Sequence, residues 1–216
     1  METISQLVHI ILHLDVYLAL FFHNYGATAY GILFLIIFCE TGLVITPFLP
    51  GDSLLFAAGA LAASQPQAVD IGSLITLLII AAILGDSSNY WIGRKFGRLL
   101  FKNPASRIFK RQYLHYTEKF YEKYGAKTVV LARFLPIVRT FAPFVAGIAT
   151  MPYAFFLRFS VLGSIAWIGL LSLAGYWFGK IPLVKNHFSL VILLIIVLSV
   201  LPAIRELLRS RRRSKP

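Results

Sequence analysis

The sequence predicts an all-α integral membrane protein built from an inverted repeat, and three observations predict it. Hydrophobic residues make up 58% of the 216 residues and charged residues only 14%, with a mean hydropathy of +0.75. The 21 Lys and Arg residues give a net charge of +12, yet none of them precedes Arg94. Short motifs also recur at a fixed spacing. This composition excludes a soluble nucleic-acid binder and a disordered basic chain, and the length fits one membrane domain over 1–216.

The first predicted element is an amphipathic helix over 1–25 that lies on the membrane surface. Its polar residues form one stripe along an otherwise apolar helix: Glu2, Gln6, His9 and His13. The two histidines have metal-ligand spacing, but the sequence places no third ligand near them, so we expect no metal. No basic residue precedes the apolar run, so we expect no cleavable signal peptide.

The second predicted element is a re-entrant helical hairpin over 28–63, which enters and leaves the membrane on one side. Each of its two apolar arms is too short to cross a hydrocarbon core of about 30 Å. Pro47, Pro50 and Gly51 force a non-helical stretch between the arms. Irregular backbone at membrane depth is tolerated only where it is buried in protein or lines a wet cavity.

Three longer apolar stretches predict transmembrane helices over 71–97, 152–180 and 187–205. A cytoplasmic amphipathic helix over 103–124 lies within the first cluster of basic residues, and a tail over 206–216 carries the second. The positive-inside rule places both clusters, and therefore the C-terminus, in the cytoplasm, where they contact anionic phospholipid headgroups. A second re-entrant hairpin over 127–150, shaped by Pro136 and Pro143, enters from that side.

Two motifs recur 86 residues further along the chain. Phe48-Leu49-Pro50 matches Phe134-Leu135-Pro136, and Tyr90-Trp91-Ile92-Gly93 matches Tyr176-Trp177-Phe178-Gly179. Because one long crossing separates the two hairpins, the two halves are expected to have opposite orientations. Inverted repeats with broken helices are typical of transporters, whose site lies where the breaks meet. The alternative is a duplication that provides only a symmetric scaffold.

Four charged residues fall within the hairpins: Glu40, Asp52, Arg133 and Arg139. Charges at membrane depth are costly and mark functional sites. Pro136 breaks the helix between the two arginines, so both guanidinium groups are able to converge on one phosphate, which such groups bind with paired hydrogen bonds. We therefore predict that Arg133 and Arg139 bind a phosphate, with Glu40 and Asp52 as their charge partners.

The predicted core has two negative and two positive charges. A phosphate that enters must displace a carboxylate, which is then buried without a partner and tends to take up a proton. This predicts proton-coupled transport, with Glu40 and Asp52 as coupling residues. Structural roles are the alternative, since Asp52 and Thr140 are placed to cap the returning half-helices. Asp86, beside Gly85, belongs to a polar patch that serves either the exit path or helix pairing.

Several motifs, taken in order, carry a family resemblance: Phe38-x-Glu40-x-Gly42, Pro47-x-x-Pro50-Gly51-Asp52, Gly85-Asp86-x-x-x-Tyr90-x-x-Gly93-Arg94-x-x-Gly97 and Arg133-Phe134-x-Pro136-x-x-Arg139-Thr140. They resemble the DedA family of bacterial membrane proteins, over about residues 20–180. Eukaryotic VTT-domain lipid scramblases resemble the same core. The resemblance implies transport of a polyprenyl phosphate lipid, undecaprenyl phosphate, from the outer to the inner leaflet of the bacterial inner membrane, with dependence on the proton gradient. It implies that Glu40 and Asp52 are an essential acidic pair, and Arg133 and Arg139 essential arginines.

Other functions stay open at this point. The same buried charges suit a proton-coupled carrier of a small ion or soluble anion, or a general phospholipid scramblase. We do not expect an enzyme, because all five histidines lie at predicted interfaces or loops and no metal-ligand cluster is present in the sequence. We expect no cofactor and no nucleic-acid partner, while a homo-oligomer is an open alternative.

Overall fold

The computed structural model describes residues 22, 25–43, 51–67, 69–100 and 111–181. Within these ranges every regular element is a helix, which confirms the predicted all-α class. Several predicted features lie outside the described residues: the amphipathic helix over 1–25 apart from Phe22 and Tyr25, the break at Pro47 and Pro50, residues 103–110 of the second amphipathic helix, the span over 187–205 and the tail over 206–216.

The chain forms two compact units that interleave in sequence. Of the described residues, the first unit holds those up to Leu33, those in 51–77 and those in 168–181. The second holds those in 34–43 and those in 78–167.

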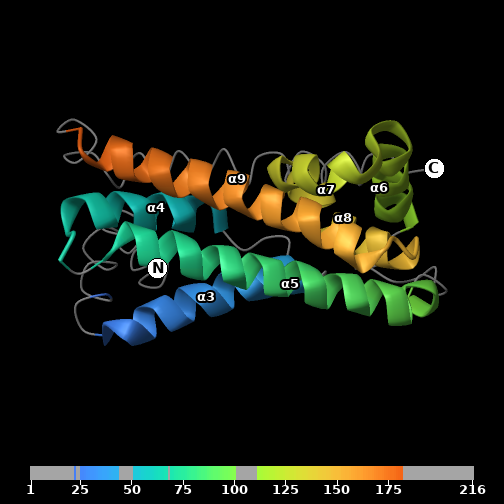
Figure 1. The fold of residues 1–216 in the computed structure, drawn as a ribbon, viewed down its shortest axis with the longest axis horizontal. Coiled ribbons are helices and arrows are strands. Elements are labelled where there is room, and N and C mark those ends of the chain that lie inside the picture. Colours follow the sequence, from blue (N-terminus) through green and yellow to red (C-terminus); the bar gives the residue numbers. More distant parts are fainter. Residues whose placement is uncertain (1–21, 23–24, 44–50, 68, 101–110, 182–216) are drawn as a thin grey trace, which may run out of the picture. The chain divides into compact units, whose positions relative to one another are not determined.

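The described helices are α3 (Ala27–Gly42), α4 (Gly51–Ser64), α5 (Ile71–Leu100), α6 (Arg111–Tyr124), α7 (Thr128–Leu131), α8 (Pro136–Ile148) and α9 (Tyr153–Gly179) (Figure 1). Helices α3 and α4 fall on the two arms of the first predicted hairpin, and α7 and α8 on those of the second. Helix α6 covers the C-terminal part of the predicted amphipathic helix. The side of the membrane from which each hairpin enters stays a prediction.

Helices α5 and α9 are long and apolar enough to cross a membrane. Their apolar segments, Ile71–Gly97 and Tyr153–Gly179, have 27 residues each, which is about 40 Å at 1.5 Å per residue. Large apolar side chains stay exposed along both helices, among them Ile80, Leu84, Leu162, Ile165, Leu170 and Leu173. A bilayer offers these side chains an apolar solvent, so the exposed faces fit contact with lipid.

In the first unit, α4 packs against the C-terminal part of α9 through glycines (Figure 1). A Cβ atom added at Gly59 would overlap the carbonyl oxygen of Ser172, and one added at Gly175 would overlap the carbonyl oxygen of Phe56. The two backbones therefore touch, which only glycine allows at these positions.

In the second unit, α8 packs against the C-terminal part of α5 in the same way. An added Cβ at Gly147 would overlap the carbonyl oxygen of Tyr90, and one at Gly93 would overlap that of Phe144. Helix α6 lies against α8 as well, because the hydroxyl of the partly buried Tyr121 donates to the carbonyl oxygen of Ala142 at 2.9 Å.

The chain turns sharply before α8. The short 3₁₀ helix η2 (Ala132–Phe134) ends at Leu135, whose backbone is extended with φ −121° and ψ 109°. Pro136 then starts α8 at a position that needs no N–H donor. Pro143, expected to shape the hairpin, lies inside α8, which continues to Ile148. The sharp turn leaves η2 and α8 on either side of Leu135, each with one of the two predicted arginines.

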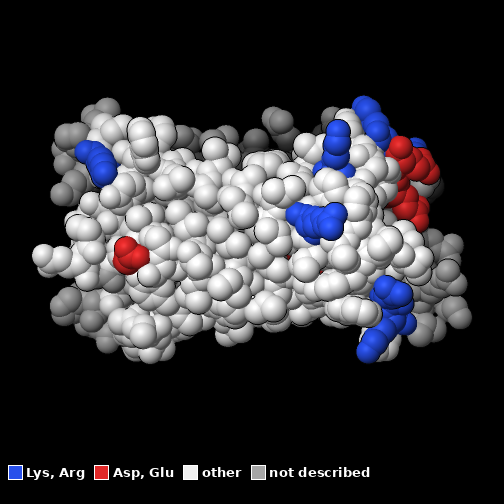
Figure 2. All heavy atoms as spheres, in the orientation of Figure 1, with Lys and Arg blue, Asp and Glu red and all other residues white. Residues whose placement is uncertain are grey.

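Charged side chains of the second unit are unevenly distributed over its surface. Figure 2 shows Lys and Arg, with some Asp and Glu, gathered toward the end where α6 and the C-terminal end of α5 lie. This is the distribution that the positive-inside rule associates with a cytoplasmic surface.

Candidate functional site

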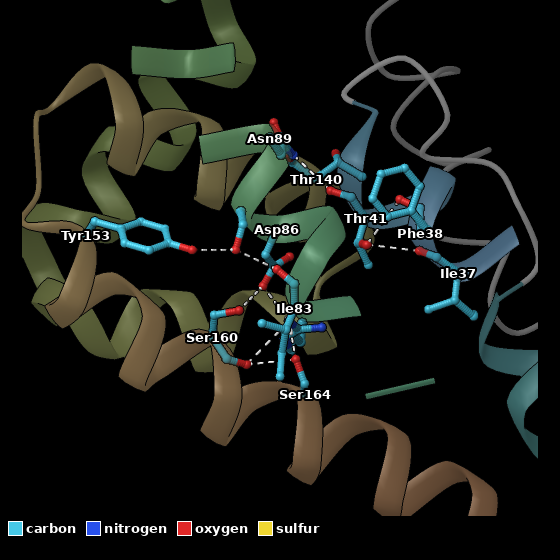
Figure 3. A network of polar contacts seen from close by, with 12 residues as sticks. Ile37, Phe38, Thr41, Ile83, Asp86, Asn89, Thr140, Tyr153, Ser160 and Ser164 are labelled. Atoms are coloured by element: carbon cyan, nitrogen blue, oxygen red, sulfur yellow. Dashed lines mark hydrogen bonds and ion pairs between the residues drawn. The ribbon is translucent and has the colours of Figure 1, made fainter. Parts of the chain in front are cut away.

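Arg133 occupies the middle of η2, is 4% exposed, and forms a buried ion pair with Asp86 of α5. Its Nη2 also donates to Ser164 Oγ of α9 at 2.7 Å. Asp86 Oδ2 accepts a further hydrogen bond from Ser160 Oγ at 2.6 Å (Figure 3). Three elements far apart in the sequence therefore meet at one buried guanidinium group.

The local backbone explains how Arg133 reaches this position. A Cβ added at Gly163 of α9 would lie 2.9 Å from Arg133 Nε, so the missing side chain of Gly163 makes room for the arginine. Within the described residues, the Nε and Nη1 atoms of Arg133 have no hydrogen-bond partner. A buried, positively charged donor without a partner is costly. Nη1 is therefore a donor that an incoming anion would satisfy.

Arg139 lies in the first turn of α8 and pairs with Glu40 of α3. Its Nη2 is 2.5 Å from Glu40 Oε1, and the exposed fractions are 7% for Arg139 and 0% for Glu40. A buried ion pair needs good geometry and further hydrogen bonds to offset desolvation. The two pairs together hold two positive and two negative charges, so the buried network has no net charge.

Trp167 of α9 contacts both guanidinium groups. The Cζ atoms of Arg133 and Arg139 lie 5.6 Å and 4.9 Å from the centroid of the Trp167 ring. Cations within about 6 Å of an indole face are attracted to its π electrons. Trp167 is itself 1% exposed, so it excludes water and holds the two arginines against a single side chain.

Asn89 fixes the backbone on both sides of the Glu40–Arg139 pair. Its Nδ2 donates to the carbonyl oxygens of Thr41 at 3.0 Å and Thr140 at 2.8 Å (Figure 3). Each of these threonines directly follows one member of the ion pair in sequence. Asn89 therefore holds the end of α3 and the start of α8 at the distance that the ion pair requires.

The structure brings together three of the four charged residues that the sequence singled out: Glu40, Arg133 and Arg139. The fourth, Asp52, lies half-buried in the first turn of α4 in the first unit. The described partner of Arg133 is Asp86, to which the sequence gave only a secondary role. Among the other predicted residues, Thr140 lies buried inside α8, where its carbonyl oxygen accepts from Asn89. Thr140 is not the cap of this helix, because the N-cap of α8 is Leu135. Gly51 and Pro136 begin α4 and α8.

Sequence reasoning did not single out Ser160 and Ser164. With Trp167 they follow a spacing of four and three residues, which places them on one face of α9. That spacing is the signal that points to a polar face on an apolar span. Within the described part of the chain, no three of His, Cys, Asp and Glu are grouped to hold a metal ion.

Comparisons with known proteins agree on one family. The family model of the VTT domain matches residues 49–177. The chain is 54% identical to "Protein DedA" of Escherichia coli K12 over 212 residues, which cover 98% of this chain and 97% of DedA. It is 45% identical over 188 residues to an uncharacterized membrane protein of Mycobacterium tuberculosis H37Rv, covering 87% of this chain and 82% of that protein.

A more distant relative is the inner membrane protein YghB of E. coli K12, which is 32% identical over 194 residues, covering 86% of this chain and 88% of YghB. No solved structure matches the chain.

Proposed function

The chain is a membrane protein of the VTT-domain family that includes DedA, and on this premise we propose that it transports undecaprenyl phosphate across the membrane. The direction we propose is from the outer to the inner leaflet of the bacterial inner membrane, for reuse of the carrier lipid, with dependence on the proton gradient. The C-terminus then lies in the cytoplasm, where basic residues contact anionic headgroups.

One observation carries the proposal: two buried arginines lie against the same indole, each paired with a carboxylate. A phosphate monoester has several acceptor oxygens and more than one negative charge near neutral pH. It is therefore able to replace both carboxylates as the partner of the arginines, and to accept from Arg133 Nη1. The carboxylates hold the arginines in place when no phosphate is bound.

We propose transport rather than catalysis because the carboxylate next to the Ser160 hydroxyl, that of Asp86, is already paired with Arg133. An activated nucleophile needs a base that accepts its proton, and a carboxylate in an ion pair with a guanidinium group is a weak base. The Ser164 hydroxyl donates to a backbone carbonyl, which is not a base. Exchange of partners around a charged group instead suits binding and release.

The proposed inverted repeat gains support from two matching helix crossings, one in each unit. Each crossing joins the returning helix of one hairpin to the long helix of the other half, and each places two glycines against two carbonyl groups. The contact residues correspond with offsets of 88 along the hairpin helices and 82 along the long helices: Phe56 and Gly59 with Phe144 and Gly147, and Tyr90 and Gly93 with Ser172 and Gly175. We expect such a reciprocal pattern of contact residues in two halves that arose by duplication.

Two alternatives share the same site. A carrier of a small soluble anion would bind inorganic phosphate as tightly as the lipid, and a general phospholipid scramblase would move lipids that lack a terminal phosphate. Competition by inorganic phosphate for binding would indicate the carrier of a soluble anion. Exchange of a zwitterionic phospholipid between the leaflets would indicate the general scramblase.

The test reconstitutes the full chain in proteoliposomes and follows undecaprenyl phosphate between the leaflets. Arg133→Lys and Glu40→Gln are expected to slow exchange at least about tenfold, since a charge-assisted hydrogen bond is worth about 1.5–3 kcal/mol. Arg158→Lys is the matched control, because Arg158 is exposed on α9. Absence of exchange in the wild type would refute the function, and full exchange in both site variants would refute the site.

A further inference from the structure

The buried carboxylate of Asp86 contacts a cation and a hydroxyl group at the same time, and these contacts suit a functional role. It is 4% exposed, and its Oδ2 accepts hydrogen bonds from Arg133 Nη2 and Ser160 Oγ. The two donors come from η2 and α9, two separate elements that both pack against α5. If Arg133 turns to another anion, Asp86 keeps one hydrogen-bond partner, Ser160.

Ser160, the partner that remains, is able to bond both the charged and the neutral form of the Asp86 carboxyl group. A hydroxyl is a donor and an acceptor, so Ser160 is able to donate to a carboxylate and to accept from a carboxylic acid. A buried carboxylate that loses its cation carries a large desolvation cost and tends to become neutral by binding a proton. Asp86 therefore has a stable arrangement both with Arg133 as the anion and without it as the acid.

The charged groups around Asp86 determine when its carboxyl group changes between the anionic and the neutral form. The charged and titratable groups that face the network come from α3, α6, η2, α8 and α9: Glu40, Tyr121, Arg133, Arg139 and Tyr153. Tyr153 does not bond Asp86 directly, since its hydroxyl donates to Ser87 Oγ at 3.0 Å (Figure 3). Of the two arginines, Arg133 forms the ion pair with Asp86, whereas Arg139 pairs with Glu40. The departure of Arg133 is therefore the change that alters the charge state of Asp86.

We propose that Asp86 is the residue that takes up the coupled proton when phosphate binds to Arg133. This inference rests on the proposed function and adds the identity of the proton carrier. As the phosphate takes Arg133, one proton from the aqueous side from which the lipid enters binds the Asp86 carboxylate. When the phosphate leaves on the other side, Arg133 returns and Asp86 releases that proton there. Asp86 thus carries one proton with each phosphate that passes Arg133.

The first test replaces Asp86 by asparagine in the full chain and measures undecaprenyl phosphate exchange in proteoliposomes with and without an imposed pH gradient. An asparagine side chain cannot bind a proton, and it resembles the neutral acid in size. We expect D86N to exchange lipid at a rate that no longer responds to the gradient. D70N is the matched control, because Asp70 is exposed at the start of α5, and it should respond as the wild type does.

The outcomes separate this inference from the proposed function. A wild-type protein that moves no lipid refutes the proposed function itself. A wild-type protein that responds to the gradient, together with a D86N protein that responds equally, refutes only the role of Asp86.

A second variant keeps the test decisive if D86N does not fold. Ser160→Ala removes one donor to the Asp86 carboxylate but leaves the ion pair with Arg133 intact. The acid form is then relatively favoured, so the pH at which exchange is half-maximal should move upward. A purely structural role for Ser160 would change the rate at every pH alike, and an unshifted pH profile in S160A would overturn the proposal.

Discussion

Trp167 is the residue on which the two arginines converge, and its loss should weaken phosphate binding. A cation–π contact contributes about 0.5–2 kcal/mol, and Trp167 makes two of them. We expect Trp167→Leu to lower the affinity for undecaprenyl phosphate about tenfold or more. Binding in detergent by isothermal titration calorimetry measures this change.

The chain offers a matched control in Trp91, which is exposed on α5 and stacks with Arg94 at 5.5 Å from Cζ to the ring centroid. Trp91→Leu removes the same side chain and a similar cation–π contact outside the site. Equal losses of affinity in the two variants would contradict the role given to Trp167.

The sequence identifies the arginines but not all of their partners, for a physical reason. Arg133, Arg139 and Glu40 stand out because charges are rare in apolar segments. The pairing of Arg133 with Asp86 depends on how η2 packs against α5 and α9, which no spacing in the sequence shows. Serines in apolar helices commonly bond the preceding turn, as Ser164 does to the Ser160 carbonyl. The spacing of Ser160 and Ser164 therefore indicates a polar face on α9 but not which side chains this face contacts.

At the scale of elements, the glycine crossings fix where each hairpin helix meets its long helix. Gly147→Ala forces α8 away from α5 because the new methyl group overlaps the Tyr90 carbonyl. We expect a loss of stability of about 1–3 kcal/mol, typical of overpacking. Gly59→Ala should have a similar effect at the other crossing. Thermal unfolding in detergent, followed by intrinsic fluorescence, measures both.

Gly169→Ala in α9 controls for the change of residue type, since nothing lies within 4 Å of a Cβ added there. Alanine is the better helix former, by about 1 kcal/mol, so this variant should be as stable as the wild type or slightly more stable. A destabilisation of Gly169→Ala that matches Gly147→Ala would show that close packing is not the cause.

The start of α5 should respond to pH through Asp70. The backbone N–H of Ser73 donates to Asp70 Oδ2 at 2.7 Å, and this bond, with the Ser73 side chain, lowers the pKa of Asp70. A lowered pKa means that the carboxylate stabilises the folded state above its unfolded pKa, near 4. That contribution is lost as the pH falls through the folded value.

We therefore expect Asp70→Ala to unfold at a lower temperature than the wild type at pH 7, and the difference to shrink below pH 4. Asp70→Asn retains an N-cap that does not titrate. The unfolding temperature of this variant should therefore not contain the pH-dependent contribution of the Asp70 carboxylate. A difference between wild type and Asp70→Ala that stays constant from pH 7 to pH 3 would exclude the cap as its source.

The positions of the helix breaks were predictable, whereas the contacts between helices were not. Proline and glycine disrupt helices locally, so the turn before Pro136 follows from the sequence. The motif match at an offset of 86 pairs Gly93 with Gly179. The helix contacts instead pair Gly93 with Gly175, one turn earlier, because close approach selects any small residue on the contact face.

At the scale of the whole molecule, the proposed topology requires that the two ends of α5 face opposite sides of the membrane. Gln67 precedes α5, and Lys123 lies near the end of α6, which follows α5 after Leu100; both residues are exposed. With one crossing between them, a residue near Gln67 belongs outside the cell and a residue near Lys123 inside it. Cys39 is the single native cysteine, so its replacement gives a background for site-specific labelling.

In the Cys39→Ser background, Gln67→Cys should react with a membrane-impermeant maleimide added to intact cells whose outer membrane has been made permeable. Lys123→Cys should react only after the inner membrane is opened. Cys39→Ser without a new cysteine gives the background level of labelling. Labelling of both positions from the same side would mean that α5 does not cross the bilayer. The two halves would then not have opposite orientations, and the proposed transport site, which requires both hairpins to meet near the middle of the membrane, would be excluded.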